Sequence, residues 1–137
     1  MLVVGAGKVA LRKTRGLLEA GARVTVVAPR WAPEFVSLPV RLLRRRFRAS
    51  DLRGVCLAFT ATDDRRVNHR VAIEAKRRGI PVNVADAPGE CDFLVPARVR
   101  SGHLQVAIST SGRSPRLAAE LRRRIERVLA TAPPASR

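Results

Sequence analysis

The sequence predicts an α/β protein with a doubly wound parallel sheet, followed by a small hairpin and a helix. Three observations favour this fold class. The chain opens on a short apolar run, a glycine turn and an apolar-periodic segment. Short apolar runs and helical patterns then alternate as far as Ala85, which is typical of βαβ units in a parallel sheet. Two further runs, joined by Ser101-Gly102-His103 and followed by an amphipathic segment, indicate a hairpin and a last helix.

A glycine turn of the form GxGxxA joins the first expected strand, residues 2–4, to a helix expected over residues 9–20. Gly5 permits the tight turn, Gly7 lets a pyrophosphate approach the backbone, and Ala10 lets the helix pack close to the strand. The free amide groups at the start of the helix would face the phosphates. An ordinary βα turn that merely uses glycines is the competing interpretation.

A second strand is expected over residues 23–28, at the distance of a βαβ unit from the glycine turn. This context supports a dinucleotide site in a Rossmann-like sheet. A typical NAD fingerprint ends the second strand with an acid that binds the ribose 2′-hydroxyl, but this chain has Ala28, Pro29 and Arg30 there. Because Arg30 could meet a 2′-phosphate instead, the residues alone leave NAD and NADP both open.

The remaining part of the sheet is predicted from apolar runs and turn residues. Its expected elements are a turn or short helix over 31–38, an edge strand over 40–47, a central strand over 55–60, a helix over 67–78 and a strand over 81–85. The continuous apolar run over 55–60 is typical of a strand covered on both faces. Asp63 or Asp64 is expected to cap the helix, and Gly79 to end it. We interpret Asn68 as a packing residue.

The pattern changes after Ala85. The expected elements there are an acidic loop over 86–92, strands over 97–100 and 104–109, and a helix over 117–129. Ser114-Pro115 is a typical N-cap followed by proline at the first helical position. The last residues are expected to form a frayed tail.

The net charge of +16, carried mostly by arginine, is the unusual number in the composition. A polyanionic partner would explain it, and so would a solvated basic surface. Nucleic acid, a small polycarboxylate and a phosphate ligand are the candidate partners. Aromatic residues make up only 4% of the chain, so no stacking platform for bases stands out and the nucleic-acid interpretation is weakened.

The chain contains two cysteines, and no apolar run approaches the length of a membrane span. The opening strand also lacks the charged flank and the cleavage site of a secretory signal. These features predict a cytoplasmic protein without a membrane partner.

Four stretches taken together resemble a known family, the NAD-dependent precorrin-2 dehydrogenase module of siroheme synthases, some members of which are also sirohydrochlorin ferrochelatases. The stretches are VVGAGKVALRKTRGLLEAGARVTVVAP (3–29), FTATDDRRVN (59–68), VNVADAPGECDFLVPA (82–97) and ISTSGRSPRLAAELRRRIE (108–126). They cover most of the chain in the family's order and spacing. Members have more residues before the first strand and a further helical segment, so metal insertion is less expected than dehydrogenation, and the chain could be a fragment.

The resemblance implies a reaction and a set of site residues. NAD would accept a hydride from precorrin-2, a tetrapyrrole with eight carboxylates, to give sirohydrochlorin for siroheme or cobalamin. The family's NAD contacts fall on Gly5, Gly7, Lys8, Val9, Pro29, Arg30 and Thr62. Its catalytic aspartate falls on Asp86, and the loop that borders the tetrapyrrole falls on Ser109, Thr110, Ser111 and Gly112. The basic charge then has a compact octa-anion as its partner.

Each of these assignments has a structural alternative. Asp86 could form an Asx turn toward Pro88, and residues 109–114 could be a plain helix-capping loop. Cys91 and His103 have no recognised metal-ligand spacing, so we interpret them as a partly buried thiol and a turn histidine, and we predict no metal site.

We expect an NAD-binding domain over residues 1–96, a dimerisation hairpin and helix over 97–130, and a disordered tail over 131–137. The expectation of a homodimer rests on four apolar residues that so small a fold can hardly bury alone: Val99, Leu104, Val106 and Ile108. Two rival functions remain. A dinucleotide-sensing module without chemistry would need neither Asp86 nor the loop at 109–112, and a nucleic-acid binder would rest on charge alone.

Overall fold

The computed structural model describes residues 1–131. Of the tail predicted over 131–137, Thr131 is helical instead, and the rest lies outside the described residues. The chain divides into two compact units, one over Met1–Phe93 and one that begins at Leu94. None of the helices within residues 1–131 is both long enough and apolar enough to cross a membrane.

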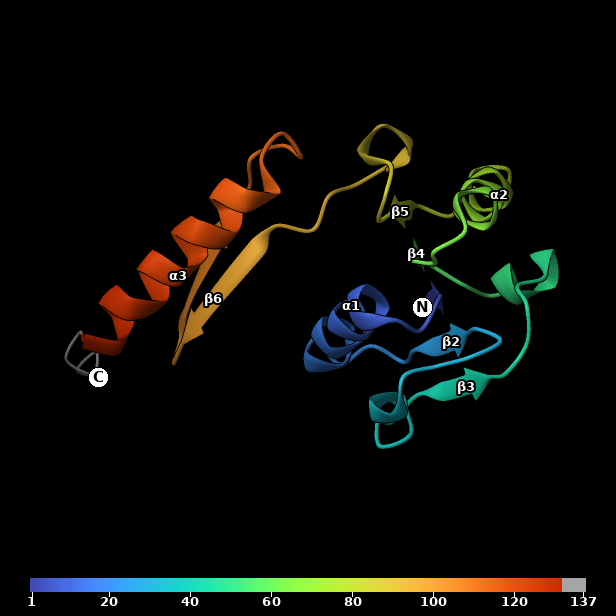
Figure 1. Ribbon diagram of the computed structural model, residues 1–137, viewed down its shortest axis with the longest axis horizontal. Helices are drawn as coiled ribbons and strands as arrows, with labels where there is room; N and C mark the ends of the chain where they lie inside the picture. Colours follow the sequence, from blue (N-terminus) through green and yellow to red (C-terminus); the bar gives the residue numbers. More distant parts are fainter. Residues whose placement is uncertain (132–137) are drawn as a thin grey trace. The chain divides into compact units, whose positions relative to one another are not determined.

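The first unit is built on a five-stranded parallel sheet in the order β3-β2-β1-β4-β5 (Figure 1). Its strands are β1 (Leu2–Val4), β2 (Thr25–Val27), β3 (Arg41–Leu43), β4 (Ala58–Thr60) and β5 (Val82–Val84). Val3 of β1 is in register with Val26 of β2 on one side and with Phe59 of β4 on the other. The strand order therefore reverses at β1, which is the position where such sheets bind ligands.

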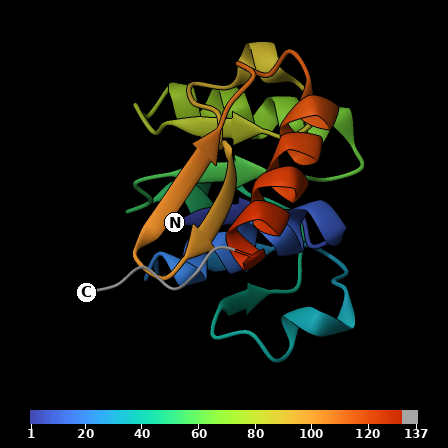
Figure 2. The ribbon, with the colours of Figure 1, turned by 90° about the vertical axis from the view of Figure 1, so that its left-hand side faces the viewer.

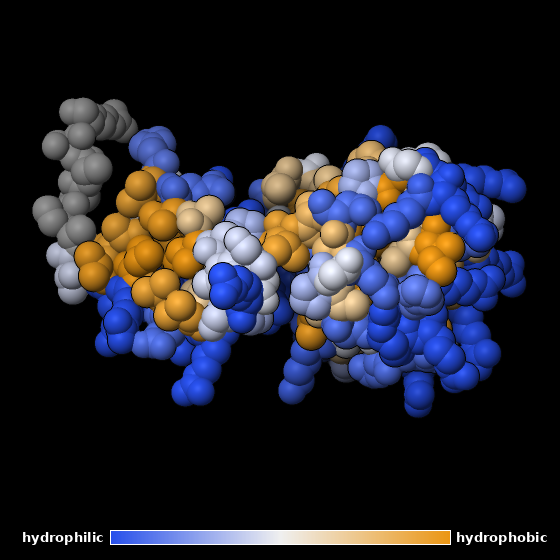
Figure 3. All heavy atoms as spheres, turned by 90° about the horizontal axis from the view of Figure 1, so that it is seen from above, coloured by the Kyte–Doolittle hydropathy of each residue, from blue (hydrophilic) through white to orange (hydrophobic). Residues whose placement is uncertain are grey.

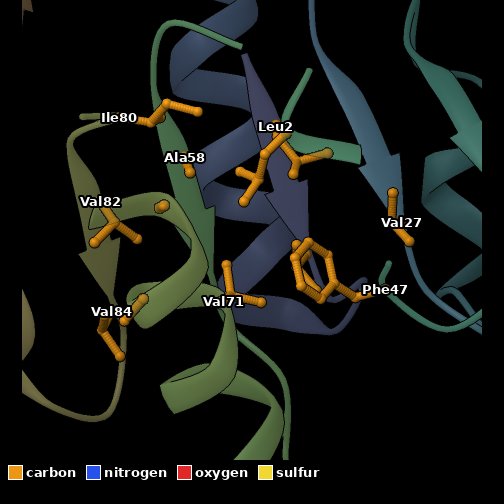
Figure 4. Packing of buried hydrophobic residues seen from close by; sticks show 12 residues of the cluster. Leu2, Val27, Phe47, Ala58, Val71, Ile80, Val82 and Val84 are labelled. Carbon is orange, nitrogen blue, oxygen red and sulfur yellow. The ribbon is translucent and has the colours of Figure 1, made fainter. Parts of the chain in front are cut away.

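Helices cover both faces of this sheet, as a doubly wound fold requires. Alternate residues of each strand project to opposite faces. Val3, Val26 and Phe59 pack with the buried side of α1 (Lys8–Glu19). The opposite face packs against α2 (Arg65–Lys76), and Figure 4 shows part of this second cluster. Its labelled members are Leu2, Val27, Phe47, Ala58, Val71, Ile80, Val82 and Val84. The predicted fold class is confirmed.

Several predicted boundaries differ from the structure. The first helix begins at Lys8, and the second begins at Arg65 instead of residue 67. The second helix starts earlier because the Asp64 side chain accepts a hydrogen bond from the Arg66 amide at 2.9 Å, which makes Asp64 the N-cap. The edge strand predicted over 40–47 is shorter, since the chain turns after Leu43 and Arg45 pairs with Asp51 at 2.5 Å.

Short 3₁₀ helices occupy three of the connections. They are η1 (Pro33–Phe35), η2 (Ala49–Leu52) and η3 (Pro88–Glu90). The turn or helix predicted over 31–38 is η1, which buries Phe35 completely.

The second unit is an antiparallel hairpin, β6 (Ala97–Ser101) and β7 (Leu104–Ile108), with the helix α3 (Pro115–Thr131). α3 packs against both strands and lies along the hairpin (Figure 2). Ser114 caps α3 as predicted, because its hydroxyl accepts a hydrogen bond from the Leu117 amide at 3.3 Å. The helix is longer than the predicted 117–129 because it begins at the proline that follows this cap.

Candidate dinucleotide and substrate site

The carboxyl ends of the strands bring most of the predicted site residues of the first unit to one edge of the sheet. Gly5 follows β1, Pro29 follows β2, Thr62 follows β4 and Asp86 follows β5. Backbone hydrogen bonds continue beyond the strands here. The Gly5 amide donates to the Val27 carbonyl at 2.9 Å, and the Ala85 amide donates to the Thr60 carbonyl at 3.0 Å. The connections therefore leave the sheet from fixed positions.

Gly5 is required by the fold itself. Its φ is +108°, in a region that side chains rarely adopt. A Cβ placed on Gly5 would also lie 2.2 Å from the Ala61 carbonyl oxygen, which is backbone and cannot rotate away. The first glycine of the motif thus permits the turn, as predicted, and also lets the β1 and β4 connections touch.

Gly7 is different, because protein packing does not require a glycine there. It is the N-cap of α1 in an extended conformation open to any residue, and a Cβ on it would meet no atom within 4 Å. The first turn of α1 has no side-chain cap and no acidic residue. Its exposed amide groups, at Lys8 and Val9, thus suit an anion. A pyrophosphate fits this exposed backbone.

The segment after β2 is tied to the glycine turn. The Ala32 amide donates to the Ala6 carbonyl at 3.1 Å, so Pro29 and Arg30 are held beside the start of α1. Arg30 is exposed and, within residues 1–131, is paired with no carboxylate. No acid stands at the end of β2, so the usual ribose ligand of an NAD site is missing in the fold as well as in the sequence.

Thr62 belongs to a buried polar network centred on Asn68. The Asn68 side-chain oxygen accepts hydrogen bonds from the Thr60 hydroxyl at 2.6 Å, the Thr62 hydroxyl at 2.7 Å and the Thr62 amide at 3.1 Å. The Asn68 amide group donates to the Thr62 carbonyl at 3.0 Å. The network joins the end of β4 to α2 and fixes the Thr62 backbone at the edge. It confirms that Asn68 is a packing residue, and it shows a role for Thr60 that the sequence analysis missed.

Asp86 lies two residues beyond β5, and 38% of its side chain is exposed. Within residues 1–131 its carboxylate accepts no hydrogen bond from a backbone amide, so the alternative Asx turn is not formed. The nearest charge is Arg65, whose Nε lies 3.9 Å from Asp86 Oδ2. The carboxylate is thus accessible, with one cation beside it.

Three residues near Asp86 form a cluster that the sequence analysis did not identify. Arg65 Nη2 donates to Glu90 Oε1, and His69 Nδ1 lies 3.1 Å from the same oxygen. The bond with Arg65, and then the bond with His69, lower the pKa of Glu90. Arg65 and His69 are spaced one helical turn apart, but their meeting with Glu90 depends on the path of the loop after β5.

The free edge of β5 is covered by the chain that follows it. The Val84 amide donates to the Cys91 sulfur at 3.1 Å, and the Cys91 thiol donates to the Val84 carbonyl at 3.2 Å. Asp92 bonds Val82 in the same way. The Asp92 amide donates to the Val82 carbonyl, and the Val82 amide donates to the Asp92 carboxylate, each at 2.9 Å. Cys91 is therefore the partly buried thiol that was predicted, and it serves to protect a strand edge.

On the face of the sheet that α1 covers, a polar contact joins α1 to β5. Lys13 Nζ donates to the Asn83 side-chain oxygen at 2.6 Å and lies 5.5 Å from the centre of the Phe59 ring. Burial, and next the charge of Arg12, lower the pKa of Lys13. The sequence analysis gave neither Lys13 nor Asn83 a role.

The predicted tetrapyrrole loop, Ser109–Gly112, belongs to the second unit, whereas the other predicted site residues belong to the first. Ser111 has φ +53° and Gly112 has φ +77°, so the loop turns through two consecutive left-handed residues. The Ser109 hydroxyl accepts from the Ser111 amide, and the Thr110 hydroxyl accepts from the Ser114 amide, both at 3.1 Å. These bonds hold the loop that leads into Ser114, the cap of α3, and the side chains of Ser109 and Ser111 are exposed.

Two family models match the chain. One, described as "Putative NAD(P)-binding", covers residues 1–97, and the other, described as "Sirohaem biosynthesis protein central", covers residues 101–127. The chain is 50% identical over 129 residues to a siroheme synthase of Methylococcus capsulatus and 47% identical over 128 residues to one of Ectopseudomonas mendocina. These matches include 91% and 92% of this chain but only 27% and 28% of the relatives, so the chain spans about a quarter of their length.

A solved structure described as "SirC, precorrin-2 dehydrogenase" is 34% identical, with a TM-score of 0.81. The match covers 93% of this chain and 64% of that one. The similarity therefore includes both units, and it confirms the resemblance inferred from the four sequence stretches. The chain belongs to the family described as "Putative NAD(P)-binding", and it is similar to siroheme synthases over about a quarter of their length.

Proposed function

We propose that this chain oxidises precorrin-2 to sirohydrochlorin with NAD as the hydride acceptor. The observation that carries the proposal is the juxtaposition, at one edge of the sheet, of a glycine turn suited to a pyrophosphate and an accessible carboxylate, Asp86. The similarity of the chain to a protein described as a precorrin-2 dehydrogenase supports the same reaction. A dinucleotide-sensing module would need the glycine turn but not the carboxylate.

The cofactor would be held by the first βα unit. Gly5 shapes the turn, Gly7 leaves room beside the backbone, and the amides of Lys8 and Val9 would bind the pyrophosphate. Pro29, Arg30 and the fixed backbone of Thr62 would border the adenosine and nicotinamide ends. When bound, the nicotinamide supplies the hydride acceptor.

We propose NAD over NADP because the family resemblance implies NAD. Arg30 is the residue that tests this choice, since a guanidinium is suited to a 2′-phosphate. Titration of both cofactors decides it: a tenfold preference for NADP that disappears in Arg30→Ala would mean that Arg30 binds the 2′-phosphate.

Asp86 is the proposed catalytic residue. Dehydrogenation removes a proton as well as a hydride, and an ionised carboxylate can accept that proton at Oδ1 or Oδ2. The same carboxylate can hold pyrrole N–H groups and so orient the macrocycle. General-base catalysis contributes roughly 10²–10⁴-fold to a rate, and orientation can contribute as much.

The loop Ser109–Gly112 is the proposed contact for substrate carboxylates. Its hydroxyls can donate hydrogen bonds while their oxygens accept from the loop backbone. Consecutive left-handed residues also turn backbone amides toward one side, which favours anions. The hydrogen bonds within the loop are therefore compatible with binding of a carboxylate.

We also propose a homodimer formed through the second unit. Val99 is already buried in the single chain, so it is less available than expected. However, Leu104, Leu117 and Val128 remain 47%, 46% and 66% exposed. Apolar side chains gather on the unit that carries the C-terminus (Figure 3), and a second copy would cover them.

The deciding experiment is an anaerobic assay of the full chain with precorrin-2 and NAD, followed by the absorbance of sirohydrochlorin. We expect product to form in proportion to NADH. Binding of NAD without any turnover, at cofactor and substrate concentrations that saturate a known dehydrogenase, would overturn the proposal in favour of a sensing module.

A further inference from the structure

Arg65 joins the two acids of the loop that follows β5. It is the first residue of α2, and its guanidinium lies beside Asp86 through Nε and bonds Glu90 through Nη2. Arg65 lies in the stretch FTATDDRRVN (59–68), but the resemblance assigned it no role. It is the only described cation paired with the proposed catalytic carboxylate within residues 1–131.

The end of Arg65 that bonds Glu90 is firmly anchored. Glu90 Oε1 is shared by Arg65 and His69, and the capped start of α2 fixes the backbone from which Arg65 projects. The bond with Glu90 raises the pKa of Arg65, and the same bond lowers the pKa of Glu90, so both remain charged. The guanidinium is therefore a permanent positive charge in a defined place.

The end that faces Asp86 is looser. The Nε–Oδ2 distance of 3.9 Å is an ion pair but is too long for a hydrogen bond. Arg65 thus supplies an opposite charge without occupying the acceptor positions of the carboxylate. Both Asp86 oxygens stay open to a proton or to an N–H group.

We propose that Arg65 is the positioning residue of Asp86, anchored by Glu90 and His69, and that it keeps the carboxylate in place against an anionic substrate. The inference rests on the proposed function. A substrate with eight carboxylates repels Asp86, and an adjacent fixed cation offsets that repulsion and limits the movement of the side chain.

The simpler alternative is an ordinary surface ion pair. Such pairs contribute little to stability, and an ordinary surface pair would not change the reaction rate. Arg65 is 46% exposed, so its effect on folding is expected to be small in either case. Kinetic and binding measurements, rather than stability alone, separate the two.

The first test compares kcat, KM and melting temperature in Arg65→Gln, Arg65→Lys and the control Arg66→Gln. Arg66 is the next residue, and its side chain is 94% exposed. We expect Arg65→Gln to lower kcat about tenfold with an unchanged melting temperature. Arg65→Lys should recover part of kcat because it restores the charge, and Arg66→Gln should behave as the native chain. Native kcat in Arg65→Gln would overturn the inference.

The second test measures binding of sirohydrochlorin, without cofactor, in a double-mutant cycle of Arg65→Gln and Asp86→Asn. If Arg65 acts through Asp86, its loss weakens binding severalfold in the native background and has little effect once Asp86 is Asn. An equal loss in both backgrounds would mean that Arg65 contacts the tetrapyrrole directly, and would overturn the positioning role. A native chain that binds but never oxidises precorrin-2 would instead refute the proposed function.

Discussion

The two units bury their apolar residues to very different degrees. Within residues 1–131, every buried aliphatic or aromatic side chain except Val99 and Ala118 is in the first unit. Helices cover both faces of the first unit's sheet, whereas the second unit places one helix on a two-stranded ladder. A hairpin covered by a single helix cannot enclose its own apolar face, and isolated hairpins are marginally stable. The first unit is thus complete as a fold, and the second is suited to a partner surface.

The proposed site follows the same division. In the first unit, site residues stand on backbone fixed by the sheet ladder and by the Asn68 network. In the second unit they stand on a loop that is held by hydrogen bonds within residues 109–114, two of them to the hydroxyls of Ser109 and Thr110. We therefore expect substitutions in the first unit to act through the fold and the chemistry, and those in the second to act through association and substrate affinity.

The largest effect is expected for Gly5→Ala. A left-handed residue with a Cβ costs about 1–2 kcal/mol, and here the Cβ would also overlap the Ala61 carbonyl. The matched control in the second unit is Gly102→Ala, which has φ +55° but open space around it. Denaturant unfolding should show a loss for Gly5→Ala that is at least twice that of the control. Equal losses of unfolding free energy in the two variants would contradict the close approach of Gly5 to the Ala61 carbonyl.

The next effect is on the reaction. Asp86→Asn keeps the shape of the side chain but removes its charge, so we expect the dehydrogenation rate to fall by at least about a hundredfold. NAD affinity should change little, because the first βα unit holds the cofactor.

The matched control is Asp63→Asn, which removes an exposed acid after β4. It should keep the native rate. If Asp86→Asn also turns over precorrin-2 at the native rate, the catalytic assignment is wrong and the loop Ser109–Gly112 becomes the next candidate.

The sequence predicted what depends on local patterns. The glycine turn, the Asp64 cap and the Ser114 cap are contained in a few adjacent residues, and the alternation of apolar runs is enough to indicate a parallel sheet. The strand β1 has its predicted bounds, whereas the other four strands of the parallel sheet are shorter than predicted, because hydrophobic runs extend beyond the residues that pair in the ladder.

The residues that were missed act through contacts distant in sequence. Arg65 meets Glu90 across 25 positions, and Lys13 meets Asn83 across 70. Cys91 returns to the edge of β5 in a way that no periodicity indicates. Such contacts depend on the path of the loop after β5, which no pattern in the chain specifies.

The oligomeric state tests whether a second copy of the chain covers the exposed apolar residues of the second unit. We expect light scattering at micromolar concentration to give about twice the 15.0 kDa of the chain. Leu117→Glu should reduce this to a single chain, because a charge would be buried at the interface. The control is Val36→Glu, since Val36 is an exposed apolar residue of the first unit. A native chain that is monomeric at every concentration would contradict the proposed dimer.

The smallest effect expected is on stability in acid, and it should arise in the first unit. Arg45 binds both oxygens of Asp51, whose side chain is only 6% exposed, and the bond with Arg45 lowers the pKa of Asp51 below its usual 3.8. A carboxyl whose pKa is lower in the folded state stabilises the fold above its unfolded pKa, and that stability is lost as the pH falls through the folded pKa. The loss should therefore occur below about pH 4. Asp51→Asn should lower the free energy of unfolding by about 1 kcal/mol at pH 7 and flatten its acid dependence. Glu120→Gln breaks an exposed pair with Arg124 in the second unit, so it should change the free energy of unfolding by only a few tenths of a kcal/mol. Urea unfolding at pH 7 and pH 3 measures both, and an acid dependence that survives in Asp51→Asn would place the sensitive group elsewhere.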